Sequence, residues 1–183
     1  TTQHDPLVGR RIVILGLARQ GKALARFAAS RGARVVVSDL RSAETLAPEI
    51  AGLADCDIEY VLGEHPLTLL DGARGVRLTN DSIEFQTRCR ARAIGLTGSA
   101  GKSTTTSLIG AIGEAAGRRT WIGGNLGYPL IDYVDTIAPD DFVVQELSSF
   151  QLEIWQSSPP IAAILNITPN HLDRHKTMAV YTM

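Results

Sequence analysis

The chain has 183 residues, of which 44 % are hydrophobic and 20 % charged, and its formal net charge is -1. This composition is that of a globular protein and excludes a disordered, collagen-like or coiled-coil chain. The balanced charge gives no electrostatic reason to bind nucleic acid or an anionic membrane, so we expect neither partner. Two cysteines are too few for a disulfide framework or a zinc cage. No apolar run is long enough to cross a membrane, and we expect a cytoplasmic protein.

The first half of the chain shows a βαβαβ pattern. The apolar run Arg11–Leu15 predicts a buried strand, the glycine loop Gly16–Gly21 follows it, and the Ala-rich stretch Lys22–Ser30 predicts a helix. The elements predicted next are a strand at Arg34–Asp39, a helix at Glu44–Leu53 and a strand at Ile58–Leu62. Strands that alternate with helices in this way predict a parallel sheet.

A second βα opening lies in the other half of the chain. The apolar stretch Ala91–Leu96 predicts a strand, the loop Thr97–Thr104 follows, and a helix is predicted to run to about Ala116. Further predicted elements are a helix at Ser82–Cys89 and strands at Asp141–Leu147 and Pro160–Ile167. We therefore expect an α/β protein with two domains, at residues 1–79 and 80–183.

The loop Thr97–Thr104 reads TGSAGKST and is the strongest local signal. Small residues between a strand and a helix let backbone N–H groups converge on phosphate oxygens at the helix N-terminus. Lys102 can reach the β- and γ-phosphates, and the Ser103 hydroxyl can ligate Mg²⁺. The loop is shorter than the common G-x-x-x-x-G-K-[ST] pattern, because Leu96 stands at the first glycine position. A Gly/Ser-rich helix start with a solvated lysine is the alternative interpretation.

A magnesium ion in this loop needs acidic or imidazole partners. In a parallel sheet, ligands collect beyond the carboxyl ends of the strands. Glu146 ends one predicted strand and His171 follows another, so we expect both on the edge that carries the phosphate loop. The alternative for Glu146 is an ordinary strand-end carboxylate, and Asp173 and His175 compete with His171 for the imidazole or acidic position.

The loop Gly16–Gly21 reads GLARQG and resembles the dinucleotide-binding pattern G-x-G-x-x-G. Ala18 stands at the second glycine position, where its methyl group would hinder the approach of a pyrophosphate. Asp39 lies at about the spacing expected for an acid that binds a ribose, and Arg41 could pair with a phosphate. The residues leave open a nicotinamide-dependent oxidoreductase and a tight turn without a ligand.

Four motifs occur along the chain in an order typical of one family. They are TGSAGKST at 97–104, GGNLG at 123–127, ELSSFQLE at 146–153 and NITPNHLDR at 166–174. With these motifs the chain resembles the Mur ligase family. The resemblance implies a Rossmann-like domain that binds a uridine-nucleotide substrate at 1–79. It also implies a central P-loop ATPase-type domain with a parallel sheet at 80–183, incomplete in this chain.

The resemblance implies an ATP-dependent amide ligase of peptidoglycan synthesis, with ATP and Mg²⁺ as cofactors. The string ELSSFQLE is typical of the members that add D-glutamate to UDP-N-acetylmuramoyl-L-alanine. In that reaction the substrate carboxylate attacks the γ-phosphate of ATP, which gives an acyl phosphate and releases ADP. The glutamate amine then attacks the acyl carbon, and phosphate leaves. Another Mur-type ligase, a folylpolyglutamate synthase and a P-loop ATPase switch are the alternatives. We expect a monomer, and we expect this chain alone to bind nucleotide without completing the reaction.

The resemblance also implies roles for individual residues. The ATP-binding residues are Gly98, Ser99, Ala100, Gly101, Lys102, Ser103 and Thr104. The catalytic residues are Lys102, Glu146 and His171, and the metal ligands are Ser103, Glu146 and His171. The substrate-binding residues are Arg19, Gln20, Asp39, Leu40, Arg41, Asn125, Ser148 and Gln151.

Several features depart from the family's pattern. Ala100 stands where many relatives have Asn, and Asn170 stands where Asp is common, so one carboxylate near the metals is lost. The stretch Asp71–Arg77 runs directly into the next segment, where relatives have a further strand, turn and helix. We therefore expect about one βα unit to be missing. The family's carbamylated lysine would lie beyond Met183, so we also expect a truncated chain.

Overall fold

The structure is a computed structural model that describes residues 5–73 and 75–182. Residues 1–4 of the first predicted domain, residue 74 within the stretch 71–77 and residue 183 of the second predicted domain lie outside the described residues. The chain divides into two compact units, Thr1–Asp81 and Ser82–Met183. In the described ranges, no helix combines the length and the apolar character that a membrane crossing requires.

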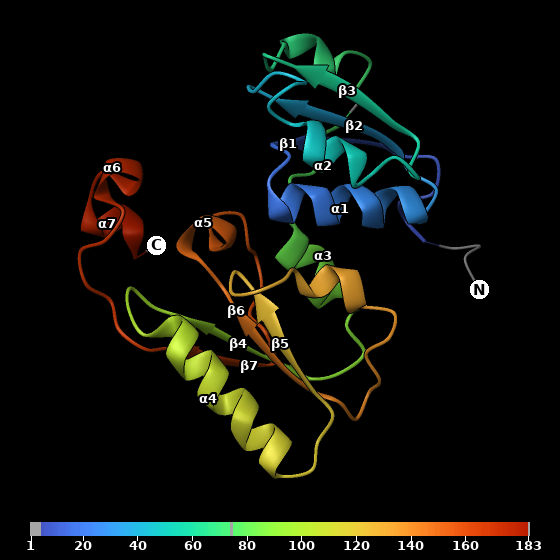
Figure 1. The fold of residues 1–183 in the computed structure, drawn as a ribbon. Helices are drawn as coiled ribbons and strands as arrows, with labels where there is room; N and C mark the ends of the chain where they lie inside the picture. The colour runs from blue at the N-terminus through green and yellow to red at the C-terminus, as the bar shows by residue number, and fades with distance from the viewer. Residues whose placement is uncertain (1–4, 74, 183) are drawn as a thin grey trace. The chain divides into compact units, whose positions relative to one another are not determined.

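The first unit is a three-stranded sheet in the order β1-β2-β3, and all of its strands run parallel (Figure 1). Helix α1 packs on β1 and β2. The elements are β1 (Arg11–Leu15), α1 (Arg19–Ser30), β2 (Arg34–Asp39), α2 (Ala47–Ala51), β3 (Ile58–Leu62) and the 3-10 helix η1 (Leu67–Leu70). The bounds of all three strands agree with the sequence prediction, because each strand is a continuous run of mostly apolar residues.

The core of this unit lies between α1 and β2. Val35, Val36 and Val37 of β2 are buried, and so are Ala25 and Ala28 on the facing side of α1. A valine-rich strand that is covered on its face by small helical residues is typical of parallel α/β packing. This packing fixes the turn between β1 and α1, which is the glycine loop at residues 16–21.

The second unit is a four-stranded sheet in the order β5-β6-β4-β7, again parallel throughout (Figure 1). Helix α4 packs on β4, β5 and β6. The strands are β4 (Ala93–Thr97), β5 (Thr120–Gly124), β6 (Phe142–Glu146) and β7 (Ile161–Ile164). The helices are α3 (Asp81–Arg88), α4 (Lys102–Ala115), η2 (Leu130–Tyr133), α5 (Ser149–Leu152), α6 (Leu172–His175) and α7 (Met178–Tyr181).

The parallel α/β class that the sequence predicts is confirmed in both units. The strand β5 was not predicted from the sequence, and the predicted bounds of β7 and α2 extend beyond their actual ends. Because all strands of the second sheet are parallel, the carboxyl ends of β4, β5, β6 and β7 share one edge. The loops that follow these strands therefore meet at this edge, where ligands collect in such sheets.

Candidate functional site

The loop after β4 turns the chain into α4 with two glycines in the left-handed region. Gly98 has φ +148° and Gly101 has φ +79°, and neither value suits an L side chain. The first backbone hydrogen bond of α4 runs from Thr105 N to the Gly101 carbonyl, and no side chain caps this helix end in the described residues. The N–H groups of Lys102, Ser103 and Thr104 are therefore open donors at the helix N-terminus, where the helix dipole favours an anion.

Lys102 bends back over this loop. Its Nζ donates a hydrogen bond of 2.7 Å to the carbonyl oxygen of Gly98, and the residue is half-buried. The ammonium group is thus held directly above the loop. An anion seated on the open N–H groups of α4 would lie within its reach.

Glu146 lies at the end of β6 and is 2 % exposed. Its Oε2 accepts a hydrogen bond of 2.8 Å from the Ser103 hydroxyl, and its Oε1 accepts one of 2.8 Å from Asn125 Nδ2. The structure therefore brings together three of the residues singled out from the sequence. Both donors are neutral, and no ion pair of Glu146 exists among the described residues. A buried carboxylate without a cation is costly, and protein carboxylates in this situation commonly hold a metal ion.

The glycines before Asn125 explain how it reaches Glu146. A Cβ atom on Gly123 would overlap the carbonyl oxygen of Tyr128, and one on Gly124 would overlap that of Glu146. The end of β5 can therefore approach the end of β6 closely only without side chains at these positions. The backbone N–H of Asn125 then donates to the Glu146 carbonyl at 2.9 Å. The two glycines before Asn125 thus allow its side-chain amide to lie beside the Glu146 carboxylate.

Ser148 and Gln151 form the capping box of the short helix α5. The Gln151 N–H donates to Ser148 Oγ at 3.2 Å, and Gln151 Oε1 accepts from the Ser148 N–H at 3.0 Å. Each side chain thereby satisfies a backbone N–H of the helix start. In this structure both residues have a local structural role, and their contact with substrate remains a prediction.

His171 is exposed and has a left-handed backbone with φ +51°. Its ring centroid lies 4.9 Å from that of Phe150 in α5, and its N–H donates to Asn170 Oδ1. The contacts of His171 thus tie it to α5 and to its own loop, whereas Glu146 is tied to Ser103 and Asn125. Among the described residues, no three His, Cys, Asp or Glu side chains gather into a metal-binding group.

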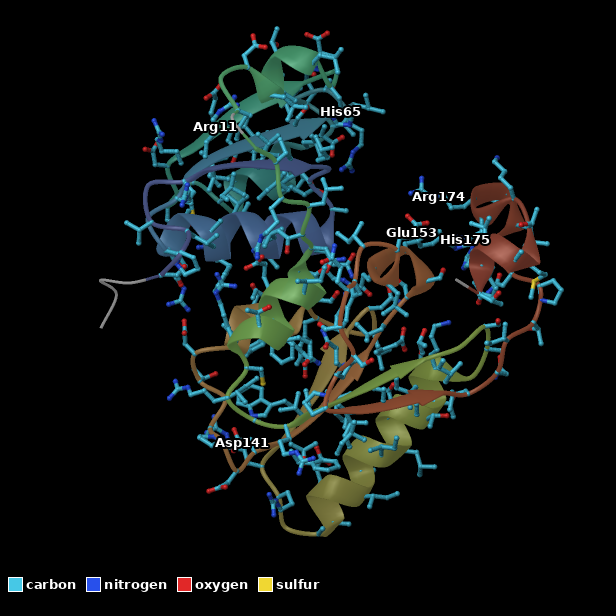
Figure 2. The ribbon with its side chains drawn as sticks, turned by 180° about the vertical axis from the view of Figure 1, so that it is seen from behind. Arg11, His65, Asp141, Glu153, Arg174 and His175 are labelled. Atoms are coloured by element: carbon cyan, nitrogen blue, oxygen red, sulfur yellow. The ribbon has the colours of Figure 1, made fainter. Side chains whose placement is uncertain are left out.

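A second polar cluster joins α5 to α6 (Figure 2). His175 is buried, its Nε2 lies 3.0 Å from Ser149 Oγ, and its Nδ1 lies 3.6 Å from a Glu153 oxygen. Arg174 Nη2 donates to Glu153 at 3.0 Å, and this hydrogen bond lowers the pKa of Glu153. From the sequence, His175 was considered only as an alternative to His171 as a metal ligand. It missed these contacts because their partners lie more than twenty residues apart in the chain.

The first glycine loop also brings predicted residues together. Asp39 Oδ2 accepts a hydrogen bond of 2.7 Å from the Leu17 N–H, and the Arg41 guanidinium donates two further bonds to Asp39. The hydrogen bonds from Arg41 hold the pKa of this buried carboxyl far below its usual range. Leu40 is exposed, and Gln20 Nε2 is buried without a hydrogen-bond partner among the described residues. Asp39 thus anchors the turn, and Gln20 retains an unused donor.

Residues 96–183 match the model of the Mur ligase middle domain. Over this stretch the chain therefore belongs to the Mur ligase family. It is 43 % identical to the UDP-N-acetylmuramoylalanine--D-glutamate ligase of Geotalea uraniireducens, over 96 % of this chain and 44 % of that protein. It is 42 % identical to the ligase of the same name from Symbiobacterium thermophilum, over 93 % of this chain and 42 % of that protein.

The chain thus spans less than half the length of these curated relatives. The first alignment extends over 199 residues, which exceeds the 183 residues of the chain, so that relative contains residues with no counterpart here. Among solved structures, the UDP-N-acetylmuramate:L-alanyl-gamma-D-glutamyl-meso-diaminopimelate ligase from Neisseria meningitides matches with a TM-score of 0.52 and 18 % identity. The match covers 95 % of this chain and 65 % of the Neisseria meningitides chain, and it supports the fold alone.

Proposed function

We propose that the second unit binds ATP and that the whole protein is an ATP-dependent ligase that adds D-glutamate to UDP-N-acetylmuramoyl-L-alanine. The names of the relatives, at 42–43 % identity over nearly all of this chain, support the reaction. The phosphate loop with its open helix end supports the nucleotide. In this proposal, residues 98–104 contact ATP, Lys102 meets the β- and γ-phosphates, and the protein works as a monomer in the cytoplasm.

The observation that carries the proposal is the environment of Glu146. Its carboxylate is buried, accepts only neutral donors, and lies beside the hydroxyl of Ser103 at the start of α4. A carboxylate and a hydroxyl next to a phosphate site fit Mg²⁺, which prefers oxygen ligands and shares its shell with phosphates. Ser103 and Glu146 would hold this ion, and His171 would hold a second one. When bound, the metal neutralises charge on the phosphate oxygens.

The residues of this chain perform the positioning in the proposed reaction. The attack of a substrate carboxylate on ATP brings two anions together, and the repulsion must be reduced. Lys102 exchanges the Gly98 carbonyl for phosphate oxygens, and the N–H groups at the start of α4 donate to the same oxygens. Asn125 orients Glu146, and its amide, together with Ser148 and Gln151, lies at the sheet edge where the muramoyl substrate would enter.

The proposed role of the first unit is to bind the uridine diphosphate of the substrate. Gln20 offers a buried donor that has no hydrogen-bond partner in the described part of the chain. The Arg41 side chain is 42 % exposed and also holds Asp39. Arg41 can therefore meet a phosphate without leaving Asp39 uncompensated. Arg19 and Leu40 flank these residues and complete the proposed contact set. The uridine-binding domain at 1–79 and the ATP-binding domain at 80–183 are part of this proposal.

An omission assay on the natural polypeptide in its full length tests the proposal. Phosphate release is measured with ATP, Mg²⁺, UDP-N-acetylmuramoyl-L-alanine and D-glutamate, and then with each component left out in turn. We expect release only when all four are present. Release that continues without the muramoyl substrate and without glutamate would identify water as the nucleophile and overturn the ligase in favour of an ATPase switch. Binding of NAD in place of the uridine substrate would instead favour an oxidoreductase.

A further inference from the structure

The segment after β7 holds the phosphate loop through a side-chain amide that no role has yet explained. Asn166 Oδ1 accepts a hydrogen bond of 2.9 Å from the Ala100 N–H, and Asn166 Nδ2 donates one of 2.9 Å to the Ala100 carbonyl. The side chain thus pairs with both polar groups of one residue, as a neighbouring strand would. Only a primary amide of this length offers a donor and an acceptor at this spacing.

The neighbouring residue Ser99 is held by the same segment. Its N–H donates to the Asn166 carbonyl at 3.0 Å, and its carbonyl accepts from Asn170 Nδ2 at 3.2 Å. The Ser99 hydroxyl donates to the Thr168 carbonyl and accepts from the Thr168 N–H, each at 2.9 Å. A serine hydroxyl has one proton, so the Tyr181 hydroxyl at 2.8 Å is the donor of the remaining bond.

These contacts decide which N–H groups of the loop can meet a phosphate. The N–H groups of Ser99 and Ala100 are already paired with Asn166, whereas those of Lys102, Ser103 and Thr104 are open. A Cβ atom on Gly98 would also come within 3.1–3.3 Å of Leu165 and Asn166. The segment therefore lies tightly against the loop, and close approach is possible because residue 98 is a glycine.

We propose that Asn166 is a positioning residue for the phosphate loop: its side-chain amide fixes the Ala100 peptide so that the N–H groups at the start of α4, and not that of Ala100, face the phosphates. This inference rests on the proposed function, since it needs a nucleotide in the loop. The same segment continues through Asn170 into His171, so the nucleotide loop and the proposed second metal ligand are held by one set of hydrogen bonds.

Titration calorimetry with Mg-ADP on the whole chain tests this role. Asn166→Leu removes both bonds to Ala100 at similar volume, and we expect ADP binding to weaken roughly tenfold, the cost of re-ordering about one backbone residue. Asn166→Asp keeps the acceptor but turns an oxygen toward the Ala100 carbonyl, and it should also weaken binding. Thr136→Val is the matched control, because it removes an exposed hydroxyl-to-carbonyl bond of the same unit outside the loop. Its ADP affinity should stay within about twofold.

The outcomes separate the two levels of the proposal. If the wild-type chain fails to bind Mg-ADP, the proposed nucleotide site is wrong and this inference falls with it. If the wild-type chain binds and both Asn166 variants bind as tightly, the positioning role alone is wrong. A lower unfolding temperature with unchanged ADP affinity would indicate a purely structural amide and would also overturn it. If Asn166→Leu does not fold, the affinity of Asn166→Asp decides the result.

Discussion

The two glycine loops of this protein are built on one plan and differ in how their acids are compensated. Each loop connects a parallel strand to a helix with a Gly-Lys pair at its start, and each lies beside an acid that ends a neighbouring strand. Asp39 is neutralised by the Arg41 guanidinium and by a backbone N–H of its own loop. Among the residues that the structure describes, Glu146 has only the neutral donors Ser103 and Asn125. In the proposed function, the first acid therefore serves the fold, whereas the second would hold a cation.

The lysines of the two Gly-Lys pairs also differ in their contacts. Lys102 lies over its own loop and donates to the Gly98 carbonyl. Lys22 instead extends toward Gly52. Its ammonium group lies so close to Gly52 that a Cβ atom there would overlap it. The same dipeptide thus supplies a cation above the second loop, whereas in the first unit its lysine contacts the end of α2. The second loop therefore has a lysine ammonium group folded back over its own backbone, where it can meet phosphate oxygens.

The largest effect is expected from the lysines. Lys102→Ala should lower phosphate release by the full-length protein by on the order of 10²–10³-fold, since one donor to the charge of the transition state is lost. Lys22→Ala serves as the matched control and should leave the turnover with saturating ATP within about twofold. Steady-state kinetics on both variants provides the measurement. Equal turnover losses in the two variants would remove the distinction between the loops.

The parallel α/β arrangement of both sheets could be predicted from the sequence, whereas the strand Thr120–Gly124 could not. The strands Arg11–Leu15, Arg34–Asp39 and Ile58–Leu62 are runs of mostly apolar and β-branched residues between turn signals, so their ends were predicted correctly. The strand Thr120–Gly124 was missed because two of its five residues are glycines, which weaken any strand signal. The reason for these glycines is the close approach of Tyr128 and Glu146, and only the structure reveals it.

In the candidate site, too, one residue was predicted from the sequence and another was not. Glu146 was found because it ends an apolar strand at the edge that carries the loop, and its bond to Ser103 agrees with that reasoning. Asn166 lies near the end of the next predicted strand, Pro160–Ile167, so the same rule could have selected it. It was overlooked because its partner Ala100 lies 66 residues away and offers only backbone atoms. Backbone partners leave no trace in the residue types of a sequence.

The glycines give the next largest effect and test the packing of each loop. Gly21→Ala would place a Cβ atom onto the carbonyl oxygen of Gly16, so the first turn of α1 must move, at a cost of about 3 kcal/mol of unfolding free energy. Gly101→Ala meets no closer atom than Leu165 Cδ1 at 3.7 Å and suffers only from its φ of +79°. Its expected cost is about 1 kcal/mol. Urea unfolding followed by circular dichroism measures both, and the reverse order would contradict this assignment.

The smallest effect concerns the compensated acid of the first loop. Asp39→Asn places an amide against the N–H groups of Leu17 and Arg41, and we expect a loss of about 2 kcal/mol of unfolding free energy at pH 7. Because the pKa of Asp39 is lowered in the folded state, its contribution is complete above about pH 4 and declines as the pH falls below that value. The wild type and the variant should therefore differ less at pH 3 than at pH 7. Asp55→Asn, which removes an exposed pairing with Arg26, should change stability much less than Asp39→Asn at pH 7. A difference between wild type and Asp39→Asn that grows on acidification would show that Arg41 does not hold this carboxylate in its charged form.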